Sequence, residues 1–117
     1  MEVAKPWHGV NEIGRAIEKH AKKYHYGVVR DLCGHGVGLK FHEEPEVCHF
    51  SQRGDGMLLV PGMVFTIEPM INMGTWKVFV DADDPYGWEV ISEDELPSAQ
   101  WEHTLLMTEH GVEILTY

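Results

Sequence analysis

Three side chains stand out because their polarity conflicts with the residues around them. His35 lies in the glycine-rich stretch Gly34–Gly38, Glu68 lies within the otherwise apolar segment Val64–Ile71, and Glu102 lies in Trp101–Met107, where side chains alternate between two faces. An ionised carboxylate in a sheet core is costly unless it is paired or bound to a metal. One imidazole and two carboxylates suit Zn, Mn, Fe(II) or Co, and three ligands with open positions are typical of a catalytic site.

The spacing of these residues leaves other interpretations open. A single strand glutamate more often lies on an exposed sheet face or pairs with a basic side chain, and a histidine among glycines more often belongs to a loop. His35, Glu68 and Glu102 are far apart in the chain, so nothing local brings them together. On these residues alone, a shared metal site is one hypothesis and not the favoured one.

Composition limits the class of protein. The 117 residues are 44% hydrophobic and 24% charged, which predicts a packed core. A formal charge of -10 argues against binding a nucleic-acid backbone. No apolar run is long enough to span a membrane and the N-terminus has no apolar signal core, so a cytoplasmic protein is expected. Cys33 and Cys48 are too few for a disulfide framework and are expected to be free thiols.

The elements that must position the three residues follow from periodicity. Apolar residues spaced by three and four predict a helix over 10–24, with Gly27 as its stop. The stretch Gly34–Gly38 predicts a close backbone approach or positive φ, and Glu43-Glu44-Pro45 is typical of a turn. Strands are predicted at 28–32, 63–67, 76–80, 88–92, 101–108 and 112–116, with an acidic turn at 81–85 and hairpin turn at 109–111. These elements predict a single α+β domain over 1–117, a mainly antiparallel sheet with one or two packed helices.

Three motifs resemble the signatures of type I methionine aminopeptidases. They are Cys33-Gly34-His35-Gly36-Val37-Gly38 with Phe41-His42-Glu43-Glu44-Pro45, then Pro61-Gly62-Met63-Val64-Phe65-Thr66-Ile67-Glu68-Pro69-Met70, then Ser98-Ala99-Gln100-Trp101-Glu102-His103-Thr104. They stand in the family's order at similar separations. The resemblance implies a cytosolic hydrolase that removes N-terminal methionine from new proteins, and it implies the C-terminal half of a pita-bread fold.

The resemblance also implies a role for individual residues. His35, Glu68 and Glu102 match the family's metal ligands, and Glu68 matches its proton shuttle. His42 matches a histidine that contacts the substrate and stabilises the developing oxyanion. Phe41 matches an aromatic residue of the methionine pocket, and Trp88 falls at the rim of that pocket.

The family's preceding half has no counterpart in this sequence. In the family that half supplies two aspartate ligands, a second histidine and part of the methionine pocket, and the site holds two ions. We therefore expect at most one divalent ion (Co, Mn, Fe or Zn) per lone chain. We also expect a homo-oligomer or a complementary N-terminal half as partner, since half of such a fold exposes apolar surface.

Two other functions compete with the aminopeptidase interpretation. The chain could be a non-catalytic metal-binding or self-associating module, because the aspartate ligands are absent. It could instead resemble another pita-bread hydrolase, prolidase-like or creatinase-like, since these share a histidine and two glutamates in the same order. Phe41-His42-Glu43-Glu44-Pro45 and Ser98-Ala99-Gln100 favour the methionine enzyme.

Overall fold

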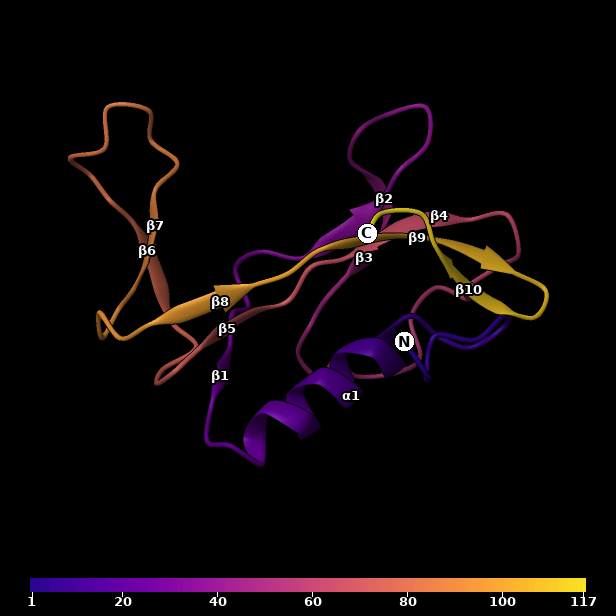
Figure 1. Ribbon diagram of the computed structural model, residues 1–117, viewed down its shortest axis with the longest axis horizontal. Coiled ribbons are helices and arrows are strands. Elements are labelled where there is room, and N and C mark those ends of the chain that lie inside the picture. Colours follow the sequence, from indigo (N-terminus) through magenta and orange to yellow (C-terminus); the bar gives the residue numbers. More distant parts are fainter.

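A computed structural model describes residues 1–117 and contains one helix and ten short strands (Figure 1). In chain order the elements are α1 (Asn11–Lys22), β1 (Gly27–Val28), β2 (Gly34–Gly36), β3 (Glu43–Val47), β4 (Val64–Ile67), β5 (Met70–Asn72), β6 (Val78–Val80), β7 (Val90–Ser92), β8 (Ser98–Gln100), β9 (His103–Thr108) and β10 (Gly111–Ile114). The predicted antiparallel α+β arrangement is confirmed. α1 is the only helix, and no helix of the structure has the length and apolarity of a membrane span.

The strands form three antiparallel sheets. The largest has the order β10-β9-β4-β2-β3, the second has the order β1-β5-β8, and β6 and β7 form a separate hairpin. β4 leads into β5, and β8 leads into β9, so one ribbon of two chain segments runs through both of the larger sheets. The three metal-ligand candidates lie on or beside this ribbon and the neighbouring strand β2.

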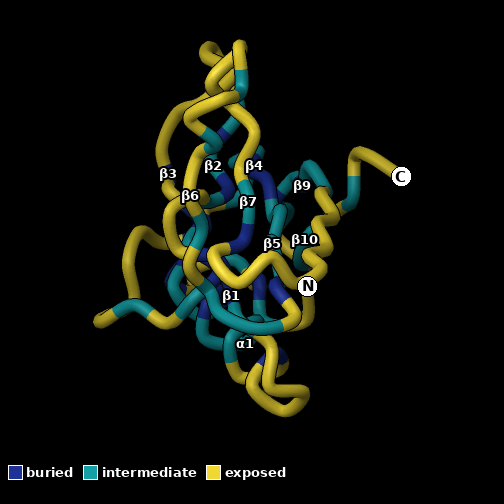
Figure 2. Tube along the Cα trace, turned by 90° about the vertical axis from the view of Figure 1, so that its left-hand side faces the viewer, coloured by how far each residue is buried: buried dark blue, intermediate teal, exposed yellow.

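The core lies between α1 and the five-stranded sheet. Phe65 of β4 and Leu105 and Met107 of β9 are fully buried, and they pack in one cluster with Ile13 of α1. Burial of side chains of this size contributes about 2 kcal/mol each. Figure 2 shows the buried positions in the middle of the molecule and exposed chain at both ends of the view.

The helix is shorter than periodicity predicted. It begins at Asn11, where backbone N–H groups of Val10 and Asn11 donate to the loop carbonyls of Met57 and Asp55. The prediction that Gly27 stops the helix is wrong, because the helix ends at Lys22 and His25 has a φ of 60°. Gly27 instead opens β1, which is much shorter than the predicted strand over 28–32.

The β6–β7 hairpin confirms the predicted strand pair and its acidic turn. Figure 1 shows the hairpin and the loop between β2 and β3 projecting on the same side of the sheets, away from α1. Asp84 shapes the turn by accepting the backbone N–H groups of Glu89, Tyr86 and Trp88, and these bonds lower the pKa of its carboxyl.

Four strands were not predicted. The glycines of β2 and the proline of β3 are typical of loops and turns, so neither segment was expected to form a strand. β5 and β8 have only three residues each, too few for a recognisable pattern. The predicted turn at Glu43-Glu44-Pro45 is wrong, since these residues open β3. Pairing with neighbouring strands overrides local preference at all four places.

The glycine-rich stretch permits a close backbone approach, and Gly34 and Gly36 do not have positive φ. A Cβ at Gly34 would collide with the backbone carbonyl of Thr66 on β4.

We therefore expect Gly34→Ala to lower the free energy of unfolding by about 2 kcal/mol in urea denaturation, because the backbone must move. Gly38→Ala is the control: its Cβ meets only the flexible Glu43 carboxylate, and we expect a change within about 0.5 kcal/mol. Equal effects at the two positions would contradict this explanation.

Candidate metal centre

His35 lies in β2 with its imidazole oriented by the backbone. Nδ1 lies 2.9 Å from the Gly36 carbonyl oxygen. A carbonyl oxygen only accepts, so Nδ1 must carry the proton and donate. The lone pair of Nε2 is then free in the neutral ring, which is the state that binds a metal.

Glu68 and Glu102 lie opposite each other in the gap of the ribbon, the short unpaired stretch between β4 and β5 on one segment and between β8 and β9 on the other. The ladder pairs Ile67 with His103 on one side of the gap and Met70 with Gln100 on the other. The register is the same on both sides, so Glu68 faces Glu102 across the two segments. Like charges placed directly opposite in a sheet are destabilising. This pair therefore favours a cation between the two carboxylates.

The Thr66 hydroxyl links His35 to Glu68. It accepts the backbone N–H of His35 at 3.0 Å and donates to Glu68 Oε1 at 2.8 Å. His35 Nε2 lies 3.4 Å from the same Oε1. Thr66 is buried, so this link holds an oxygen of Glu68 next to the free lone pair of His35.

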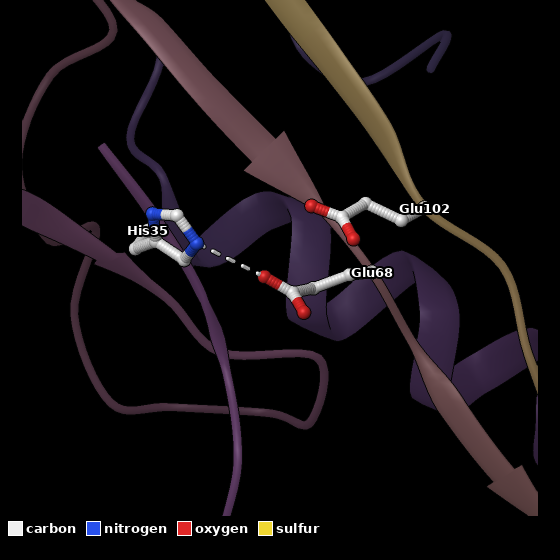
Figure 3. Close-up of side chains that lie close together, drawn as sticks. All are labelled: His35, Glu68 and Glu102. Atoms are coloured by element: carbon white, nitrogen blue, oxygen red, sulfur yellow. Dashed lines mark ion pairs between the residues drawn. The ribbon is translucent and has the colours of Figure 1, made fainter. Parts of the chain in front are cut away.

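The three predicted ligands converge in space. Figure 3 shows the side chains of His35, Glu68 and Glu102 pointing toward one another, with α1 behind them. One ligand atom from each residue can be chosen so that all lie within 4.8 Å of one another. His35 and Glu68 are largely buried and Glu102 is exposed. One nitrogen and two carboxylate donors, with one side open, fit a divalent first-row ion.

His49 is a part of the site that the sequence did not reveal. It is fully buried, and its Nε2 accepts the backbone N–H of Glu68 at 3.1 Å. Its Nδ1 is buried without a hydrogen-bond partner. Burial lowers the pKa of this imidazole to about 4, so the ring is neutral at physiological pH. No local sequence pattern predicted this role, because the bond joins the segment that follows β3 to the segment between β4 and β5.

His42 and Phe41 lie on the loop beside His35. The ring centroids of His35 and His42 are 4.2 Å apart, and those of His35 and Phe41 are 5.7 Å apart. Phe41 is 76% exposed, so its apolar ring is available to a ligand. Trp88 is equally exposed but lies on the separate β6–β7 hairpin, so the structure groups two of the three predicted substrate contacts around His35.

A cleft of about 620 Å³ opens beside His35 and His42. Cys33 and Cys48 line the same cleft as free thiols, as predicted. Burial, and then the nearby Glu46 carboxylate, raise the pKa of both thiols. Both therefore remain protonated near neutral pH and are weak nucleophiles.

The fold and the sequence have close relatives. The chain is 50% identical over 116 residues to methionine aminopeptidase A of Synechocystis sp., covering 99% of this chain and 45% of that protein. The crystal structure of methionine aminopeptidase from Rickettsia prowazekii matches with a TM-score of 0.91 and 43% identity, over 98% of this chain and 46% of that one. Prolidase from Pyrococcus furiosus matches less well, with a TM-score of 0.66 and 31% identity, over 98% of this chain and 27% of that one.

The extent of these matches decides what they show. The chain spans less than half the length of the relatives named above, so each relative resembles it in fold and sequence only over the matched part. The fold of this chain is that of the corresponding part of pita-bread methionine aminopeptidases, as the motifs predicted. The sequence profile of metallopeptidase family M24 matches residues 1–109, nearly the whole chain, and the chain therefore belongs to this family.

Proposed function

We propose that this chain forms part of a cytoplasmic, metal-dependent aminopeptidase that removes N-terminal methionine from new proteins. The convergence of His35, Glu68 and Glu102 carries the proposal, because it joins three distant motifs at one point. The methionine aminopeptidase relatives support the substrate class. The higher TM-score of the Rickettsia enzyme relative to prolidase favours methionine over Xaa-Pro substrates.

His35, Glu68 and Glu102 are the residues that would hold the ion. A divalent ion supplies Lewis-acid chemistry that makes water reactive at neutral pH. Glu68 would also move a proton during hydrolysis. Its Oε1 accepts from the Thr66 hydroxyl and lies 3.4 Å from His35 Nε2, so Oε2 is the less engaged oxygen and would take the proton.

His42, Phe41 and Trp88 would bind the substrate. The His42 ring lies beside His35 and offers an N–H to the scissile carbonyl oxygen as negative charge develops there. The exposed ring of Phe41 supplies apolar surface for a methionine side chain. Trp88 would reach the rim of that pocket from the hairpin, which projects on the same side of the sheets (Figure 1).

A complementary half of the fold, in the same polypeptide or on a second copy or chain, would complete the site. Three ligands suffice for one ion but not for the two-ion centre of the family, so a lone copy would bind at most one Co, Mn, Fe or Zn ion. A largely hydrophobic hollow of about 610 Å³ between α1 and β5 supports such a partner. Its lining includes Ile17, Tyr24, Pro69 and Ile71. Uncovered apolar surface of this kind marks an interaction site.

Hydrolysis of a Met-Ala-Ser peptide tests the proposed activity. With Mn²⁺ or Co²⁺ added, we expect methionine release that chelation abolishes and that Glu68→Gln reduces by at least about 100-fold, because the proton-accepting carboxylate is lost. Xaa-Pro dipeptides should not be cleaved. Sedimentation of the same sample reports whether the active species is an oligomer.

A non-catalytic module is the second candidate, favoured by the three-ligand set of this chain. Its signature is one bound ion per chain without methionine release at high protein concentration, whether or not the chain self-associates. That result would remove the peptidase function for the chain tested.

A further inference from the structure

His49 is the one titratable side chain in the buried core, and it has no ligand role in the metal centre. It follows β3 by two residues and is fully buried. Its single hydrogen bond reaches across to the backbone N–H of Glu68, not to a carboxylate. The contact therefore acts on the chain that carries Glu68.

The Glu68 N–H lies in the gap of the ribbon. Regular pairing stops after Ile67 and resumes at Met70. Pro69 has no N–H, so Glu68 supplies the only N–H that this strand has within the gap. His49 Nε2 accepts a hydrogen bond from that N–H, and this bond fixes the backbone at the residue that carries the Glu68 carboxylate.

Stability alone does not account for an imidazole at this position. Its second nitrogen, Nδ1, is buried without a partner. A half-satisfied buried polar group is worse for stability than an apolar side chain of similar size. The bond to Glu68 is thus the one contribution that an apolar residue could not replace.

We propose that His49 is a positioning residue, which holds the Glu68 carboxylate in its metal-binding orientation through the Glu68 backbone N–H. Thr66 fixes the end of the same side chain, so backbone and carboxylate are held by two separate groups. The inference rests on the proposed metal role of His35, Glu68 and Glu102. It adds a residue whose loss weakens metal binding without removing a ligand.

Three variants separate positioning from packing. His49→Gln places an amide oxygen where Nε2 accepts, His49→Asn is too short to reach Glu68, and His49→Leu removes the acceptor at similar volume. For each variant, Co²⁺ affinity is measured by visible absorption with a competing chelator, and thermal unfolding of the metal-free chain is followed by circular dichroism at pH 7.

We expect His49→Leu and His49→Asn to bind Co²⁺ at least about 10-fold more weakly than the unmodified chain, and His49→Gln to stay within about threefold. The unfolding midpoint of metal-free His49→Leu should remain within about 4 °C of that of the unmodified chain. The substitution removes the buried, unpaired Nδ1, and this gain offsets the loss of the hydrogen bond to the Glu68 N–H. A fall in metal affinity at constant stability is a result that a packing role does not produce.

Other outcomes overturn the inference. If His49→Leu binds Co²⁺ like the unmodified chain, or if the Gln and Leu variants are equally weak, the acceptor plays no part. If metal-free His49→Leu is much less stable or unfolded, His49 serves the fold. Failure of the metal centre itself looks different, because Co²⁺ binding would then be absent in the unmodified chain or unaffected by loss of Glu102.

Discussion

We expect replacement of Glu102 by alanine to lower the Co²⁺ affinity of the metal centre by about 100-fold and to leave the fold intact. Loss of a residue that only supports a metal ligand lowers metal affinity by about 10- to 100-fold. Loss of a ligand itself should therefore lower the affinity by about the upper value of this range. Glu102 is exposed, lies in the gap of the ribbon and faces the carboxylate of Glu68. Its removal takes away a like charge, so the metal-free chain loses no stability.

The measurement is a Co²⁺ titration followed by visible absorption, with circular dichroism as the test of folding. Glu113→Ala is the matched control, because Glu113 is an exposed strand glutamate on β10 and outside the ligand cluster. The control should bind Co²⁺ like the unmodified chain. Unchanged stoichiometry and affinity in Glu102→Ala would show that the assigned ligand is wrong.

Acidification should destabilise the metal-free protein through His49. The imidazole pKa is about 4 in the folded chain, against 6.5 for an unperturbed histidine side chain. Between these values the unfolded chain binds the proton more readily, so stability is complete above about pH 6.5 and falls as the pH drops toward about 4. The full difference is about 3 kcal/mol.

Urea unfolding of the metal-free chain between pH 7 and pH 4 measures this loss. Other groups titrate in the same range, so the informative quantity is the difference between the unmodified chain and His49→Leu. That difference should grow in favour of the leucine variant as the pH falls. Parallel curves for the two proteins would mean that His49 does not resist protonation in the folded state.

Sequence patterns predicted the elements whose signals are local. The apolar stripe of α1 and the hairpin of β9 and β10 were found because residues three or four apart, or two apart, report on one face. The convergence of His35, Glu68 and Glu102 was predicted only through the resemblance of whole motifs. Spacing could not have joined residues so far apart in the chain.

The features that sequence did not predict depend on pairing between distant segments. β2 is a strand because Gly34 and Gly36 let it approach β4 and β3, which are determined elsewhere in the sequence. The role of His49 requires the gap in the ribbon, which lies where the pairing of β4 with β9 ends and before the pairing of β5 with β8 begins. Neither is visible in any window of local sequence.

The two long segments of the ribbon keep one register, so the loop that connects β5 to β8 can change in length without changing how the segments pair. Asn72 pairs with Ser98, so the chain between these two residues, which includes the β6–β7 hairpin, begins and ends at one residue pair of the ribbon. Residues added within that loop would not alter which carboxylate faces which. One residue added between Ile67 and Met70 would turn the following side chains to the other face. The separation of Glu68 and Glu102 along the chain is therefore arbitrary, while their separation in space is not.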